Sequence, residues 1–108
     1  MDVAGVKSQV EGGIIQAASW SLYDQVTYEA TGITSRDWDS YPIISFNNIP
    51  EINIEIIDRP GSPYLGVGEI AAGPTGASIA NAINDAIGLR LREMPFNSEA
   101  IKPAALSN

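Results

Sequence analysis

Glu69 is the residue of this 108-residue chain whose setting most favours chemistry. It closes the glycine-rich stretch Gly66-Val67-Gly68-Glu69, which we expect to lie between a strand over residues 52–58 and a helix over residues 74–87. Glycines adopt backbone dihedrals that side chains forbid, so such a loop can press closely against a ligand or another segment. Loops held by a rigid scaffold often carry functional residues, although a single loop glutamate is most often only solvated surface.

Composition excludes several kinds of site. The chain has no cysteine and no histidine, which excludes a disulfide, a thiolate metal site, a catalytic cysteine and a Ser-His-Asp triad within it. No run of Asp and Glu has calcium-loop spacing. The 6 basic and 13 acidic residues give a net charge of −7, which disfavours general nucleic-acid binding. No apolar run approaches the ~20 residues that a membrane span needs, so we expect a soluble chain.

The first element that the pattern predicts is a helix over residues 8–26. Ser8 and Glu11 have the spacing of a capping box, whereas Gly5 argues against an earlier start. One predicted face is apolar and consists of Ile14, Ile15, Ala18, Leu22 and Val26. The other predicted face consists of Gln9, Gly12, Gly13, Gln16 and Trp20.

The paired glycines of that second face leave two interpretations open. Each glycine inside a helix costs about 1 kcal/mol relative to alanine, so something must approach this face closely. Tight packing against another helix would explain the pair. A ligand lying across the glycines, with Gln9 or Gln16 as a hydrogen-bond partner, would explain it equally well.

The middle of the chain predicts extended structure. Ala30-Thr31-Gly32 is a turn signal that fits either a short hairpin or an extended excursion, and residues 36–41 read as a surface loop with Trp38 folded under it. Ile52, Ile54 and Ile56 alternate with polar residues, the pattern of a half-buried strand.

The C-terminal part predicts a second helix over residues 74–87, with Pro74 at its first position and Gly88 as its left-handed stop. Residues 89–92 fit a short strand or an extended exit. Asn97 or Ser98 would cap one last turn, which Pro103 limits. We therefore predict a single domain over residues 1–108 of the α+β class, with two main helices packed on a small sheet.

Residue spacing offers two chemical alternatives. Gly66, Gly68 and Ala71 match the loose dinucleotide pattern G-x-G-x-x-G/A, but the glycines do not directly follow a strand, and a neighbouring glutamate would repel a pyrophosphate. A hydrolytic carboxylate pair would combine Glu69 with Asp37, Asp39 or Asp58. Sequence cannot bring those loops together, so separate solvated carboxylates are favoured.

Four stretches, taken in order, resemble one family. They are residues 9–16 (Gln-Val-Glu-Gly-Gly-Ile-Ile-Gln), Trp38-Asp39-Ser40-Tyr41-Pro42, residues 66–69 running into residues 79–83, and residues 89–95. Together they resemble the C-terminal part of the large, molybdopterin-binding subunit of molybdenum hydroxylases. This is the xanthine dehydrogenase and aldehyde oxidase family, and the resemblance is closest to its bacterial isoquinoline oxidoreductase-like and aldehyde dehydrogenase large subunits. The ordered set spans nearly the whole chain.

The resemblance implies roles for particular residues. Glu69 falls on the glutamate of the family's G-x-G-E motif, a general base toward molybdenum-bound hydroxide in the oxidation of aldehydes or N-heterocycles with water-derived oxygen. A carboxylate is a weak base in water, and desolvation in a glycine-walled loop would strengthen it. The implied cofactor contacts are Gln9, Gly12, Gly13, Gly68, Ala71 and Ala72.

The resemblance also implies much that lies outside this chain. The family's large subunits are several times longer, so we expect an excised piece or a truncated gene product that is inactive alone and self-associates through exposed apolar surface. The complete enzyme would carry molybdopterin with molybdenum, in the cytosine dinucleotide form, and none is expected on this piece alone. Implied partners are the rest of the large subunit, iron–sulfur and FAD or cytochrome subunits, and a small-molecule substrate. Cytoplasm and periplasm both stay open.

Two rival functions remain. The chain could be a non-catalytic interaction or assembly module that has kept the fold without the chemistry. The less favoured rival is a carboxylate hydrolase, which would need no molybdenum.

Overall fold

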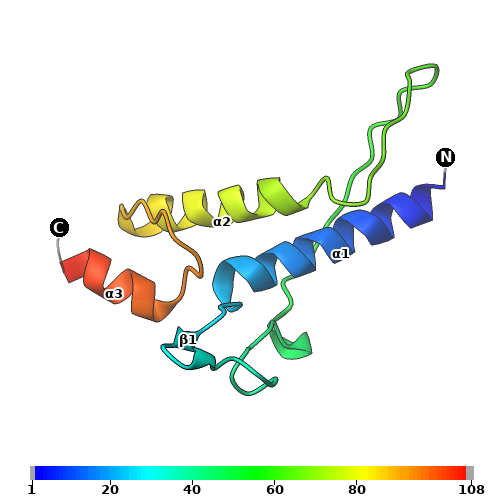
Figure 1. Ribbon diagram of the computed structural model, residues 1–108. Helices are drawn as coiled ribbons and strands as arrows, with labels where there is room; N and C mark the ends of the chain where they lie inside the picture. The colour runs from blue at the N-terminus through cyan, green and yellow to red at the C-terminus, as the bar shows by residue number, and fades with distance from the viewer. Residues whose placement is uncertain (1, 107–108) are drawn as a thin grey trace.

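The computed structural model describes residues 2–106 and is built on two long helices that lie side by side and run in the same direction (Figure 1). A small hairpin and a third, shorter helix flank this pair. The described elements are α1 (Val3–Leu22), β1 (Tyr28–Glu29), β2 (Gly32–Ile33), a 3₁₀ turn (Phe46–Asn48), α2 (Ala72–Ile87) and α3 (Ser98–Leu106). The α+β class with two main helices is therefore confirmed.

Helix α1 begins earlier and ends earlier than the pattern predicted. Asp2 is its N-cap residue, and the Val6 amide donates to the Asp2 carbonyl at 3.0 Å, so the first turn forms well before Ser8. The capping box at Ser8 was wrong, because one glycine at position 5 is too weak a breaker to delay the helix. Val26 lies beyond the helix end and is 56 % exposed, so it does not extend the apolar face.

Helix α2 matches its prediction within two residues at its start. Gly88 adopts a φ of 72°, and its amide donates to the Asn84 carbonyl at 2.8 Å, which confirms it as the left-handed stop. The exit over residues 89–92 is extended and not a strand. The Asn97 side chain accepts from the Ala100 amide at 3.0 Å, but α3 then continues through Pro103 to Leu106, so the prediction that Pro103 limits it to one turn was wrong.

Small residues bring α1 and α2 together. A Cβ placed on Gly13 would lie 3.4 Å from the Ala71 Cβ. One turn into α2, a Cβ on the buried Gly76 would lie 3.0 Å from the Met94 Cε and 3.3 Å from the Ser21 Oγ. The described apolar core is correspondingly small and consists of Ala17, Ala18, Leu89 and Phe96. The α1–α2 pair is therefore stabilised more by the close approach of the two helix backbones than by the burial of large apolar side chains.

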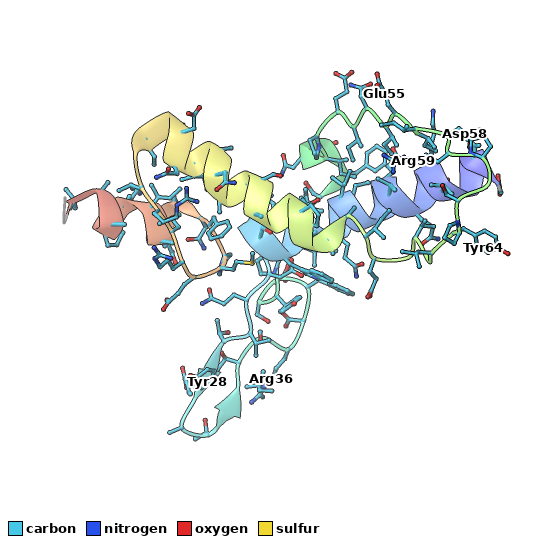
Figure 2. All side chains as sticks on the ribbon, turned by 90° about the horizontal axis from the view of Figure 1, so that it is seen from above. Tyr28, Arg36, Glu55, Asp58, Arg59 and Tyr64 are labelled. Carbon is cyan, nitrogen blue, oxygen red and sulfur yellow. The ribbon has the colours of Figure 1, made fainter. Side chains whose placement is uncertain are left out.

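Within residues 2–106 the sheet is a single two-stranded hairpin and is smaller than predicted. Strands β1 and β2 pair antiparallel, with Tyr28 opposite Ile33 and Glu29 opposite Gly32, so the hairpin interpretation is confirmed. Figure 2 shows Tyr28 on this hairpin, away from the two helices. Among the described elements the two helices contact each other and not the hairpin, so the prediction that they pack on the sheet was wrong.

Two other predictions for the middle of the chain were wrong. The strand predicted over residues 52–58 does not form as an element, because no strand among residues 2–106 lies beside it. Trp38 is 77 % exposed, so it is not folded under its loop.

The described chain is extended for its size. Its radius of gyration is 17.1 Å, whereas a compact domain of this length has about 13 Å. Its accessible surface is 8336 Å², roughly 2,500 Å² more than a compact protein of this mass exposes. Much of the excess is apolar, as at Phe46 and Leu65, which are each 89 % exposed.

Candidate functional site

An open groove of about 760 Å³ runs along α1 on the side of the paired glycines. Helix α1 supplies one wall, and the loop after β2 and the loop before α2 supply the other. The lining residues are Ser8, Gln9, Gly12, Gly13, Ile15, Gln16, Ser19, Trp20, Asp24, Trp38, Tyr41, Ile43, Ile44 and Gly68. The whole second face predicted for α1 therefore lines one groove.

Most of the predicted cofactor contacts meet in this groove. Gln9, Gly12, Gly13 and Gly68 all line it, although Gly68 comes from a distant part of the chain. Ala71 and Ala72 do not line it. They sit at the start of α2, where the Ala72 amide donates to the Glu69 carbonyl at 3.2 Å and fixes the end of the glycine loop.

Of the paired glycines of α1, Gly13 fits the helix-packing interpretation and Gly12 fits the ligand interpretation. Gly13 approaches Ala71 across the helix contact, as tight helix packing requires. Gly12 has nothing within 4 Å of the position that a Cβ would occupy, so no contact among the described residues requires a glycine there. Because Gly12 lines the groove and still carries the helix penalty of glycine, it fits close approach by a ligand.

The loop glycines do not serve the purpose first expected of them. Among the described residues, positive φ occurs only at Gly32, Gly61 and Gly88, so Gly66 and Gly68 adopt dihedrals open to any residue. A Cβ on either would also meet nothing within 4 Å. What Gly68 contributes is the absence of a side chain from the groove wall.

Glu69 follows Gly68 directly and is exposed. Its flanking residues place it on the glycine side of α1, since Gly68 lines the groove and Ala71 approaches Gly13. Among residues 2–106 its carboxylate has no hydrogen-bond or ion-pair partner. Glu69 itself does not line the groove, and its exposed carboxylate lacks the desolvation that the glycine-rich loop was expected to provide.

A buried serine network fixes the far wall of the groove, and the sequence reasoning missed it. The Ser19 hydroxyl donates to Asp24 Oδ1 at 2.7 Å and accepts from the Ile44 amide at 2.9 Å. The Tyr41 hydroxyl donates to Asp24 Oδ2 at 3.3 Å. Desolvation, with the Asp24 charge, raises the pKa of Tyr41, so the phenol stays a neutral donor. A polar Ser19 among small residues on the inner side of α1 was the available signal.

Replacing Ser19 with alanine should destabilise the chain by about 1–3 kcal/mol, because it leaves the Ile44 amide and the Asp24 carboxylate without their partner. The free energy of unfolding is measured by urea denaturation followed by circular dichroism. Ser78→Ala is the matched control, since the Ser78 hydroxyl bonds the Pro74 carbonyl on an exposed face and its loss should change stability by less than about 0.5 kcal/mol. Equal losses in the two variants would show that the network is not structural.

The carboxylate-pair alternative gains no support from the structure. Hydrogen bonds from the Ser40 side chain and backbone lower the pKa of Asp37, the opposite of what a general acid requires. Among residues 2–106 no group of three or more Asp and Glu side chains could hold a metal ion. No helix in that part of the chain is long and apolar enough to cross a membrane.

Comparison with known proteins gives a consistent set of relatives. No family model matches the chain. It is 41 % identical over 100 residues to one subunit of the nicotinate dehydrogenase of Pseudomonas putida, covering 93 % of this chain and 8 % of that subunit. It is 30 % identical over 91 residues to the beta subunit of isoquinoline 1-oxidoreductase from Brevundimonas diminuta, covering 84 % of this chain and 12 % of that protein.

A solved structure shares the fold. The crystal structure of quinoline 2-oxidoreductase from Pseudomonas putida superposes with a TM-score of 0.85 at 27 % identity, covering 95 % of this chain and 14 % of that one. The chain therefore spans only about a tenth of the length of the relatives that it matches.

Proposed function

This chain is related to a segment of the subunits of xanthine dehydrogenase-family molybdenum hydroxylases, and we propose that it forms one wall of the cofactor site of such an enzyme. The observation that supports the proposal is the groove that brings Gln9, Gly12 and Gly68 together from two distant elements. The complete enzyme would oxidise an aldehyde or an N-heterocycle with oxygen derived from water. We propose Glu69 as its general base.

The groove suits a flat heterocycle with polar edges, such as molybdopterin. Gly12 leaves room that a Cβ would fill, so a planar group can lie against the α1 backbone. The side-chain amides of Gln9 and Gln16 each offer donors and an acceptor, and Trp20 and Trp38 add apolar surface to the lining. We propose that the extension of the cofactor is the cytosine dinucleotide form.

The chemistry divides between the cofactor and Glu69. The molybdenum cofactor, when bound, would supply the redox centre that takes up the electrons of the substrate. Glu69 would accept a proton from the attacking water-derived oxygen, and Gly68 beside it adds no side chain to the groove wall. The segment over residues 68–72 would hold the base in place, because the Ala72 amide bonds the Glu69 carbonyl.

We propose that the rest of the large subunit closes the groove and that separate subunits remove the electrons. Several relatives are themselves subunits, such as the one from nicotinate dehydrogenase and the gamma subunit of the 6-hydroxypseudooxynicotine dehydrogenase complex. Iron–sulfur subunits, with FAD or cytochrome subunits, would carry electrons away. One open wall holds a ligand weakly, so this segment alone should neither retain the cofactor nor turn over.

Replacing Gly12 with alanine should have opposite effects in two settings. In the isolated chain it should raise the free energy of unfolding by up to about 1 kcal/mol, since alanine is the better helix former and the added Cβ meets nothing. In a complete subunit the same Cβ should obstruct the cofactor, so the molybdenum and pterin content of the purified enzyme should fall several-fold. Thermal unfolding and metal analysis measure the two effects.

Glu11→Ala is the matched control, because Glu11 is an exposed neighbour on α1 that does not line the groove. It should leave the molybdenum content unchanged. A Gly12→Ala enzyme with full cofactor content would refute the proposal that the cofactor lies on this face.

A further inference from the structure

Residues 51–58 form an extended segment whose backbone has no partner among residues 2–106. No backbone hydrogen bond reaches these residues, and the nearest in the arm beyond them runs from the Ser62 amide to the Arg59 carbonyl at 3.2 Å. Figure 1 shows the segment entering an arm that projects away from the helix pair, and Figure 2 labels Glu55, Asp58 and Arg59 along it. Unpaired amides and carbonyls in a row are a template for another strand.

The side chains of this segment already alternate as a strand's do. Ile52, Ile54 and Ile56 are half-buried, while Asn53 and Glu55 between them are exposed. The alternation stops at Ile57, which is 81 % exposed. The exposure pattern of a half-buried strand is thus present over residues 52–56, although no strand of the described chain lies beside them.

We propose that residues 52–56 are a β-strand whose partner is a strand of the same large subunit that lies outside this chain. The relatives leave ample polypeptide for it, since the chain spans 8 % of one subunit and 12 % of another. The partner strand would place apolar residues beside the three isoleucines and neutral or basic residues beside Asn53 and Glu55. Pairing would satisfy the open backbone groups and cover part of the exposed apolar surface.

A second copy of this chain is a poorer partner. Antiparallel self-pairing about Asn53 would place Glu51 opposite Glu55, and parallel self-pairing in register would place each glutamate beside its own copy. Antiparallel self-pairing about Ile54 would place Asn53 opposite Glu55, so it would meet only the general repulsion between two acidic chains. Like charges directly opposite one another destabilise a strand pair, and each chain carries a net charge of −7. A strand of different sequence avoids both penalties.

Hydrogen exchange tests the proposal directly. The probe is the Pseudomonas putida nicotinate dehydrogenase subunit in which this chain replaces the 41 %-identical segment, compared with the isolated chain. In the isolated chain the amides of residues 52–56 should exchange freely. In the chimeric subunit they should exchange at least about 100-fold more slowly, at alternate residues if one edge is paired and at all of them if both are.

Asn53→Pro gives a second, independent readout. It removes one strand donor, so it should lower the melting temperature of the chimeric subunit while leaving that of the isolated chain unchanged, and Asn53→Ala should be nearly silent in both. The inference does not depend on the cofactor groove, and Glu69→Gln should leave the exchange pattern as it is.

Three results would overturn the proposal. The first is free exchange at residues 52–56 in a chimeric subunit whose α1 and α2 amides are protected. The second is protection in the isolated chain that rises with protein concentration, which would identify a second copy as the partner. If the chimeric subunit does not fold, exchange is measured on the intact subunit at the aligned positions, and free exchange there would be the third.

Discussion

Replacing Glu69 with glutamine in a complete subunit should lower kcat by about 10²–10⁴-fold, the range that a positioned general base contributes. Glutamine has nearly the same shape but cannot take up a proton at its side chain. Glu69 is exposed beside the groove and has no partner among residues 2–106, so the substitution breaks no contact within this part of the chain. The molybdenum and pterin contents should therefore stay at the level of the unmodified enzyme.

The measurement pairs steady-state kinetics with metal analysis of the same preparation. Glu29→Gln is the matched control, because Glu29 is an exposed glutamate on the hairpin, away from the groove. An unchanged kcat for Glu69→Gln would remove Glu69 from the chemistry and favour a non-catalytic assembly module. Loss of molybdenum together with activity would make Glu69 a residue that holds the cofactor.

Replacing Gly76 with leucine should destabilise the isolated chain by about 1–3 kcal/mol or unfold it completely. Even a Cβ at this buried position would lie 3.0 Å from the Met94 Cε and 3.3 Å from the Ser21 Oγ. A leucine would push α2 off α1 and disturb the Ser21 carbonyl that accepts from the Phe96 amide at 2.6 Å. Because the apolar core is small, the free energy of unfolding of the isolated chain is expected to be low, so this loss could unfold it.

Thermal unfolding followed by circular dichroism measures the effect. Ala77→Leu is the matched control, since Ala77 is the next residue of α2 and is exposed. It should change the free energy of unfolding by less than about 0.5 kcal/mol. Similar stabilities for the two leucine variants would show that α1 and α2 do not depend on close approach at Gly76.

Local patterns predicted the local features of this fold. The α2 boundaries, the Gly88 stop, the hairpin and the second face of α1 follow from signals within a few residues of one another. Predictions that depended on a single residue were less secure. Gly5 did not delay α1 and Pro103 did not end α3, because each perturbs one helical position while its neighbours still favour the helix.

Contacts between residues that are distant in the sequence could not be predicted from such local patterns. The alternation of Ile52, Ile54 and Ile56 correctly indicated an extended, half-buried segment, but alternation does not say which strand lies alongside. The Ser19–Asp24–Tyr41 network was missed for the same reason, since it closes through the Ile44 amide across 25 residues. The site residues Gln9, Gly12 and Gly68 were suggested by the family resemblance, and their meeting in one groove required the fold.

The parallel arrangement of α1 and α2 has a consequence for synthesis on the ribosome. About 65 residues separate the end of α1 from the end of α2, so at ~5–20 residues per second α1 emerges roughly 3–13 s before its partner is complete. During that time the face that will contact α2 presents Gly13 and Ser21, which offer little apolar surface for chaperones or other nascent chains to bind. Because this contact is made of small side chains, α1 exposes little apolar surface and is less prone to aggregate before α2 has been synthesised.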